Sequence, residues 1–194
     1  KMDEIMQYTT TWVNELQANS VADQAHRQFG WTGDECESFI LGNQEIFKDK
    51  VEFNPPSTQT AGLFPSFEPR GTMEEWKKTI NFYNKDGFEL HQFVVGTSFG
   101  SPLMQFSPIK CAAMHIYSKD SGLGKTTAME AGVSVWGKPE DLLTYEQDTV
   151  NTRMNRGEIY HSLPLYMDEL TNTHGRKLSD LVYQLTGGKQ RGRM

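Results

Sequence analysis

The chain has 194 residues, of which 37% are hydrophobic and 23% charged, and its formal net charge is −6. This composition is ordinary for a globular protein, and no apolar run approaches the roughly 20 residues needed to span a bilayer. The acidic balance argues against a protein that coats nucleic acid with its whole surface, so any DNA contact should be confined to a few loops.

The first 56 residues are predicted to form an N-terminal α+β region. Apolar residues at roughly helical spacing indicate a helix within residues 1–29. Short apolar runs then alternate with turn residues over 39–53, which predicts a small antiparallel β element. Asn54-Pro55-Pro56 stops regular structure, and residues 57–72 are expected to form an extended linker.

Residues 73–109 are predicted to be a helical lead-in to the rest of the chain. Thr72 and Glu75 have the spacing of a capping box, which favours a helix that runs from there to about Tyr83. A second, apolar helix is expected over about 88–105, with a break near Ser101-Pro102.

Residues 110–194 alternate apolar runs with helical patterns, which is typical of a parallel α/β sheet. Strands are expected at 111–117, 142–145 and 163–167, and helices at about 125–135, 151–160 and 176–185. The predicted fold class is therefore α/β, with a P-loop NTPase (RecA/AAA+-like) parallel sheet core. This core has fewer strands than such a motor needs, so residues 110–194 are expected to be a truncated, partial ATPase core.

A glycine-rich stretch follows the first expected strand, and it reads Ser121-Gly122-Leu123-Gly124-Lys125-Thr126-Thr127. Glycines let backbone N–H groups curl around a phosphate, the lysine reaches the β- and γ-phosphate oxygens, and the first threonine hydroxyl ligates Mg²⁺. All of these residues are candidates for nucleotide binding, with Lys125 also catalytic and Thr126 also a metal ligand. The usual loop has a glycine where this chain has Lys119.

Asp168 and Glu169 follow the last expected strand and are predicted to complete the site. Asp168 would hold Mg²⁺ through water, and Glu169 would orient and deprotonate the attacking water. A glutamate directly after the magnesium aspartate favours hydrolysis coupled to mechanical work over a nucleotide kinase or a small GTPase. ATP and Mg²⁺ are therefore the expected cofactors.

The C-terminal stretch is glycine-rich and basic. Lys189, Arg191 and Arg193 are candidates for DNA contacts or for a trans-acting arginine that reaches the nucleotide of a neighbouring subunit. A solvated loop is the plainer interpretation of the same residues. Arg153 and Arg156, between the two halves of the site, are expected on a solvated helix face.

Several motifs occur together and in a fixed order. They are Phe29-Gly30-Trp31, Phe99-Gly100-Ser101-Pro102-Leu103, Gly124-Lys125-Thr126-Thr127-Ala128, Ser134-Val135-Trp136-Gly137 and Leu163-Pro164-Leu165-Tyr166-Met167-Asp168-Glu169. Over about residues 29–194 the chain resembles a family of ATPase domains, catalogued as a domain of unknown function, in phage and mobile-element primase-helicase-like proteins. The resemblance implies a ring of identical subunits, single-stranded or forked DNA as a partner, and a primase or polymerase domain in the same polypeptide. It also implies the cytoplasm of a bacterial host, and no membrane partner is expected.

The sequence thus predicts an ATP-hydrolysing motor domain, a DNA helicase or translocase of a phage-type replication protein. Two alternatives stay open. One is a P-loop ATPase that loads or remodels protein partners, and the other is a non-catalytic nucleotide-binding assembly module.

Overall fold

A computed structural model describes residues 1–194 apart from 20–24, 110, 146–147, 170–174 and 188–194. Its helices are α1 (Met2–Asn19), α2 (Met73–Ile80), α3 (Glu89–Gly100), α4 (Lys125–Val133), α5 (Pro139–Leu142), α6 (Val150–Tyr160) and α7 (Gly175–Gly187). Short 3-10 helices are η1 (Ala61–Phe67), η2 (Asn81–Tyr83) and η3 (Pro102–Phe106). The helices expected near 125–135, 151–160 and 176–185 are therefore present as α4, α6 and α7.

Four short strands form an antiparallel sheet in the order β1-β2-β3-β4, which confirms the predicted antiparallel element. The strands are β1 (Gly30–Thr32), β2 (Ser38–Leu41), β3 (Gln44–Ile46) and β4 (Val51–Phe53). Trp31 lies opposite Phe39, and Ile40 lies opposite Glu45. Phe39 and Ile40 are both buried in the core, so side chains from both faces of β2 contribute to it.

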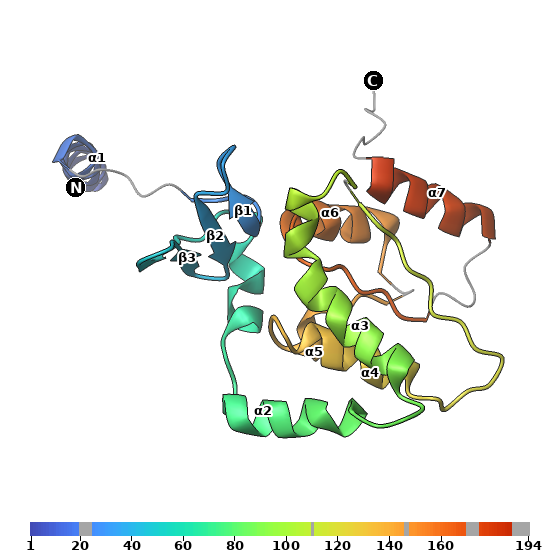
Figure 1. Ribbon diagram of the computed structural model, residues 1–194. Coiled ribbons are helices and arrows are strands. Elements are labelled where there is room, and N and C mark those ends of the chain that lie inside the picture. Colours follow the sequence, from blue (N-terminus) through green and yellow to red (C-terminus); the bar gives the residue numbers. More distant parts are fainter. Residues whose placement is uncertain (20–24, 110, 146–147, 170–174, 188–194) are drawn as a thin grey trace.

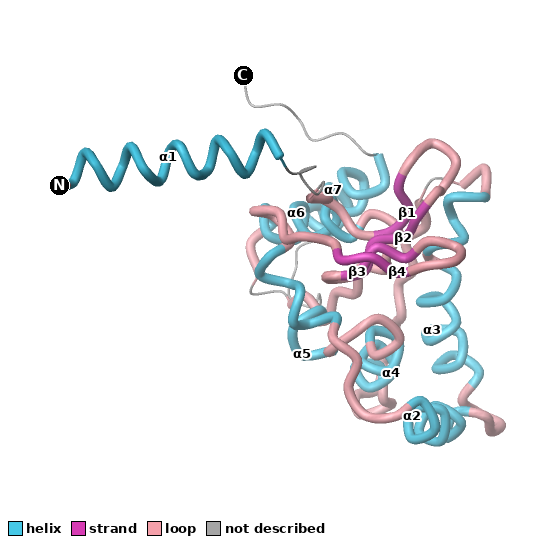
Figure 2. The backbone as a smooth tube through the Cα atoms, turned by 90° about the vertical axis from the view of Figure 1, so that its left-hand side faces the viewer, coloured by secondary structure: helices cyan, strands magenta, loops and turns pink. Residues whose placement is uncertain are grey.

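The helix α1 extends away from the remainder of the chain in both views (Figures 1 and 2). It holds no buried residue, although its apolar side chains recur at helical spacing. Within the part of the chain that the structure describes, no helix is both long enough and apolar enough to cross a bilayer.

Aromatic contacts join the sheet to the helices. The Phe39 ring stacks on Trp136 with centroids 5.9 Å apart, and the Trp31 indole N–H donates to the Pro102 carbonyl at 2.9 Å. Residues Ala61–Phe67, expected within a linker, form η1, and the buried Phe67 ring lies 4.6 Å from that of Phe29. One core thus connects the sheet, η1 and helices α3, α4, α5 and α6.

Helices α3 and α4 lie side by side and position the glycine-rich loop (Figure 1). The Ser98 hydroxyl on α3 donates to the Gly132 carbonyl on α4 at 2.6 Å, and both residues are buried. The Trp136 indole N–H, just beyond α4, donates back to the Ser98 carbonyl at 3.1 Å. These two hydrogen bonds join α4 to α3, and they also satisfy polar groups that the packing of the two helices buries.

The capping box that precedes α2 is confirmed. The Glu75 backbone N–H donates to the Thr72 hydroxyl oxygen at 3.2 Å, and the Thr72 hydroxyl donates to the Glu75 carboxylate at 3.0 Å. The apolar helix expected over 88–105 is also present, as α3, and it gives way to η3 at Pro102 because proline cannot supply a helical N–H.

The predicted parallel α/β sheet, and with it the P-loop NTPase fold class, is wrong. Residues 111–117 lie in no strand, and Met114 and Tyr117 are 53% and 72% exposed. Between the other two expected strands, the described residues form a single parallel bridge, which pairs Thr144 with Met167. The sheet that the described residues form is the small antiparallel one, and it lies to one side of helices α3 to α7 (Figure 1).

The difference arises because a short apolar run indicates only that a segment is buried. It does not show whether the segment is a strand or which elements pack against it. Leu163 is buried and Tyr166 packs against the same core, so this segment is buried by packing against helices and not by pairing in a sheet. Pro164 has no N–H to donate to a ladder, which further limits pairing there.

Candidate functional site

The glycine-rich loop has a left-handed backbone at two glycines. Gly122 has φ +75° and Gly124 has φ +74°, a region that glycine enters at little cost and other residues avoid. Helix α4 begins at the next residue, Lys125, so the unpaired N–H groups of its first turn adjoin the loop. Loops with left-handed residues before a helix N-terminus form concavities that favour anions.

The loop is open to solvent over most of its length. Its exposed residues are Ser121, Gly122, Leu123, Thr126 and Thr127, while Gly124 and Lys125 are half-buried. The Lys125 ammonium donates to the Asp120 carbonyl at 3.1 Å, so its positive charge lies against the loop itself. Lys119 and Asp120 are exposed, which keeps both charges in water.

A hydrogen bond connects the loop to the acidic pair. The Thr126 hydroxyl donates to Asp168 Oδ2 at 2.7 Å, across 42 residues of sequence. The Asp168 backbone N–H donates to the Thr144 carbonyl at 2.9 Å, which anchors the aspartate beside the start of α4. The structure therefore brings the two predicted halves of the site into contact, although no parallel sheet carries them.

Glu169 occupies a tight turn next to Asp168. Its φ is +58°, a left-handed conformation that costs a non-glycine residue about 1–3 kcal/mol unless its surroundings fix it. Here the Glu169 backbone N–H donates to Asp168 Oδ1 at 2.8 Å. The Asp168 carboxylate therefore accepts hydrogen bonds at both oxygens, and one of them holds the turn that presents the exposed Glu169 side chain.

The pair of oxygen donors at Thr126 and Asp168 fits Mg²⁺. Magnesium is usually bound through one or two carboxylates together with substrate phosphates, and it takes oxygen ligands. Because the Thr126 hydroxyl gives its hydrogen to Asp168, both of its lone pairs stay available to a cation. Among the described residues, no cluster of three or more His, Cys, Asp and Glu side chains is suited to a metal.

Tyr166 anchors the segment that leads into the acidic pair. Its hydroxyl donates to the Val94 carbonyl at 2.9 Å and lies 2.9 Å from Thr97 Oγ1 and 2.8 Å from Ser98 Oγ. All three partners belong to α3, which also packs on α4. One helix thus supports both the loop that precedes α4 and the segment that carries Asp168.

Tyr145 is a residue near the acidic pair that the sequence analysis placed in a strand and gave no role. Burial is the main cause that raises the pKa of its phenol, and the negative charges of Glu130, Asp168 and Glu169 raise it further. Tyr145 directly follows Thr144, whose carbonyl accepts from the Asp168 backbone N–H at 2.9 Å. No motif or spacing in the sequence marks Tyr145.

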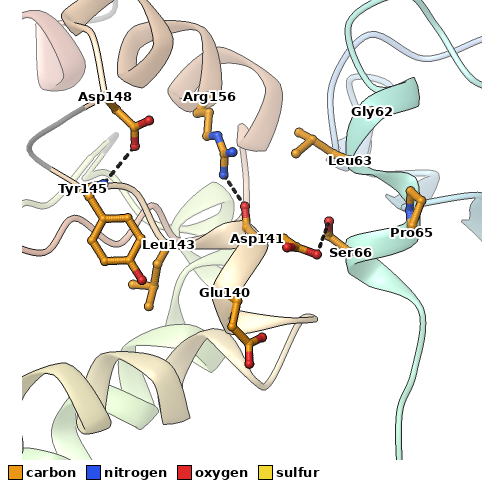
Figure 3. A pocket seen from close by; sticks show the side chains of 10 residues that line it. All are labelled: Gly62, Leu63, Pro65, Ser66, Glu140, Asp141, Leu143, Tyr145, Asp148 and Arg156. Atoms are coloured by element: carbon orange, nitrogen blue, oxygen red, sulfur yellow. Dashed lines mark hydrogen bonds between the residues drawn. The ribbon is translucent and has the colours of Figure 1, made fainter.

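A pocket of about 480 Å³ lies beside η1, α5 and α6 (Figure 3). Its lining consists of Gly62, Leu63, Pro65, Ser66, Glu140, Asp141, Leu143, Tyr145, Asp148 and Arg156. The Arg156 guanidinium donates to the Asp141 backbone carbonyl at 2.7 Å. The residues of the glycine-rich loop do not line this pocket, and its carboxylates would repel phosphate, so it is separate from the candidate phosphate site.

The remaining candidate residues do not join the site. Lys189, Arg191 and Arg193 lie outside the described residues. Arg153, expected on a solvated face, is only 5% exposed, and its guanidinium donates to the Asp148 carbonyl at 2.9 Å and 3.2 Å. Arg153 therefore stabilises the segment before α6 through buried hydrogen bonds to its backbone.

Comparison with known proteins gives one match. The family model described as "Domain of unknown function (DUF927)" covers residues 3–194, a longer stretch than the motifs alone indicate. No curated protein and no solved structure matches the chain. The family description names no activity, so any function must be argued from the site.

Proposed function

The chain belongs to the DUF927 family of domains of unknown function, and we propose that it binds ATP with Mg²⁺ at the loop 121–127 and hydrolyses it. The hydrogen bond between Thr126 and Asp168 is the observation that carries this proposal. It joins a glycine-rich anion loop to a carboxylate that the sequence motif assigns to magnesium.

Each residue has a role that its chemistry allows. Backbone N–H groups of the loop and the first turn of α4 donate to phosphate oxygens, and the Lys125 ammonium neutralises charge on the β- and γ-phosphates. Thr126 and Asp168 would hold Mg²⁺, which would offset negative charge on the phosphate oxygens. Glu169 accepts a proton from water as the water oxygen attacks the γ-phosphorus, and the bond to the ADP oxygen breaks to give ADP and phosphate.

The coupling of hydrolysis to DNA is the finer part of the proposal. The resemblance to primase-helicase-like proteins and the Asp168-Glu169 pair support a DNA helicase or translocase. ATPase activity that single-stranded DNA stimulates, together with unwinding of a forked duplex, would support that part. Stimulation by a protein partner alone would instead favour an ATPase that loads or remodels proteins.

The test compares the full chain with two site variants. Lys125→Ala should abolish binding of a fluorescent ATP analogue, because the phosphate charge loses its cation. Glu169→Gln should retain binding and lower the hydrolysis rate by about 10²- to 10⁴-fold, the usual contribution of a general base. Binding by fluorescence anisotropy and phosphate release are measured with and without Mg²⁺.

Two exposed residues provide matched controls. Lys78→Ala on α2 removes an exposed lysine, and Glu158→Gln on α6 neutralises an exposed glutamate, and neither residue belongs to the loop or the acidic pair. Neither should change binding or hydrolysis. ATP binding without turnover in the wild-type chain would show a non-catalytic nucleotide-binding module, and absence of ATP binding would refute the proposal.

A further inference from the structure

An aromatic cluster next to the glycine-rich loop has no role in the proposed chemistry. His91 lies in the first turn of α3, and its Nε2 is 3.0 Å from the Leu123 carbonyl oxygen. A carbonyl oxygen only accepts, so Nε2 carries the hydrogen of this bond. His91 Nδ1 is buried and has no hydrogen-bond partner among the described residues, so a hydrogen there would be a buried donor without an acceptor.

Two neighbouring rings hold the imidazole in place. Tyr83 stacks on His91 with centroids 5.3 Å apart and an interplanar angle of 29°, and the Phe88 ring lies 5.1 Å away. The Tyr83 hydroxyl in turn donates to the Thr127 carbonyl at 3.4 Å. The cluster thus touches the backbone on both sides of Gly124-Lys125-Thr126.

The contact with Gly124 shows how closely the imidazole approaches the loop. A Cβ atom at Gly124 would lie 3.1 Å from His91 Nε2, and the positive φ disfavours any side chain there. The peptide between Leu123 and Gly124 turns about ψ of Leu123 and φ of Gly124, and at the glycine end no Cβ restricts that rotation. The hydrogen bond to the Leu123 carbonyl therefore restrains a peptide plane that has only one side chain beside it.

The direction of that peptide plane matters for phosphate. In a planar trans peptide the C=O and N–H point in opposite directions. Because the Leu123 carbonyl faces His91, the Gly124 N–H faces away from α3. We propose that His91 is a positioning residue, which fixes the peptide between Leu123 and Gly124 so that the Gly124 N–H is available to a nucleotide phosphate. The phosphate part of this inference rests on the proposed function.

Substitutions at one position separate the hydrogen bond from the packing. His91→Phe keeps an aromatic ring against Tyr83 and Phe88 but has no donor. His91→Gln places an amide N–H₂ near the position of Nε2 and can still donate to Leu123. Leu90→Ala, at a residue that is 72% exposed and adjacent in α3, is the matched control.

Amide hydrogen exchange over residues 122–127 of the nucleotide-free chain is the primary measurement. His91→Phe should exchange faster in this segment, while His91→Gln and Leu90→Ala should resemble the wild type. In binding assays His91→Phe should raise the dissociation constant for a fluorescent ATP analogue by about five- to tenfold, as expected for one lost neutral hydrogen bond. Glutamine should restore most of the affinity, which a merely structural defect would not predict.

The positioning role of His91 and the proposed ATP binding would be refuted by different results. Unchanged exchange in His91→Phe, or equal defects in His91→Phe and His91→Gln, would overturn the positioning role whether or not ATP binds. A wild-type chain that binds no ATP would overturn the proposed function, while the exchange data would still decide whether His91 fixes the loop. Circular dichroism and thermal melting confirm that each variant is folded before either measurement.

Discussion

The Thr126 hydroxyl donates to Asp168 Oδ2 at 2.7 Å, and this bond leaves the hydroxyl lone pairs available to a cation. We expect Thr126→Ala to raise the Mg²⁺ concentration needed for half-maximal ATP binding by about tenfold, whereas Thr126→Ser should stay close to the wild type. Serine is the conservative control because it keeps the hydroxyl. A magnesium titration monitored with a fluorescent ATP analogue measures the shift. A titration of Thr126→Ala identical to that of the wild type would exclude Thr126 as a ligand.

Gly132 allows α4 to approach Tyr166. A Cβ atom there would lie 2.5 Å from the Tyr166 hydroxyl oxygen and 3.3 Å from Ser98 Oγ. Overpacking of this kind costs about 1–3 kcal/mol, which exceeds the roughly 0.5–1 kcal/mol that alanine gains over glycine in a helix. Gly132→Ala should therefore lower the free energy of unfolding, as measured by urea denaturation.

Gly96 provides the matched control for that substitution. It lies in α3, and apart from its chain neighbours and the backbone of its own helix, no atom of the described residues is within 4 Å of the position its Cβ would take. Gly96→Ala should raise the free energy of unfolding by about 0.5–1 kcal/mol, since only helix propensity changes. Equal effects at Gly132 and Gly96 would contradict the close packing between α4 and Tyr166.

Local patterns in this chain were predictable because neighbouring residues determine them. The capping box of Thr72 and Glu75 depends on a spacing of three residues, and its hydrogen bonds are present. The pairing partner of residues 111–117 is a non-local property, and alternating runs of apolar residues do not specify it. The helices near 125–135, 151–160 and 176–185 could therefore be predicted from the sequence, but the predicted parallel pairing of the segments between them was wrong.

The candidate site shows the same division. Motif order alone suggested that Thr126 and Asp168 belong together, and the structure has them in contact, while their roles in ATP chemistry stay predictions. His91 was not identified, because it contacts the loop from a distant helix and no spacing rule marks it. Only the folded packing of α3 against the loop reveals His91.

The Tyr166 hydroxyl tests the link between α3 and the acidic segment. Tyr166→Phe removes the hydrogen bond to the Val94 carbonyl and the close oxygen contacts with Thr97 and Ser98. Thr97 Oγ1 still donates to Val94 and Ser98 Oγ still donates to Gly132, so no buried partner is stranded. We expect a loss of about 0.5–1.5 kcal/mol in the free energy of unfolding.

The control for this loss is Tyr183→Phe on α7, where the side chain is 78% exposed. Its effect should stay within about 0.5 kcal/mol, as for most surface substitutions. Urea denaturation of both variants measures the difference. Equal stabilities for Tyr166→Phe and the wild type would mean that the hydroxyl network does not stabilise this segment.

Asp141 should make the stability of the chain depend on pH on the acid side. Hydrogen bonds from the Lys138 ammonium, at 3.0 and 3.1 Å, are the main cause that lowers the pKa of the Asp141 carboxyl, and the Ser66 hydroxyl lowers it further. A carboxyl whose pKa is lower in the folded state stabilises the protein above its unfolded-state pKa. That contribution disappears as the pH falls from there through the folded-state pKa.

The variant Asp141→Asn removes this pH-dependent contribution, while Asp86→Asn removes an exposed carboxylate in a turn and serves as the control. Urea denaturation between about pH 7 and pH 2 should show the wild type more stable than Asp141→Asn near neutrality, with the difference shrinking as Asp141 becomes protonated. Asp86→Asn should run parallel to the wild type over the same range. If the free energies of unfolding of the wild type and Asp141→Asn differed by the same amount at every pH, the Asp141 charge would not be the cause. A contribution from that charge has to disappear when the carboxyl becomes protonated.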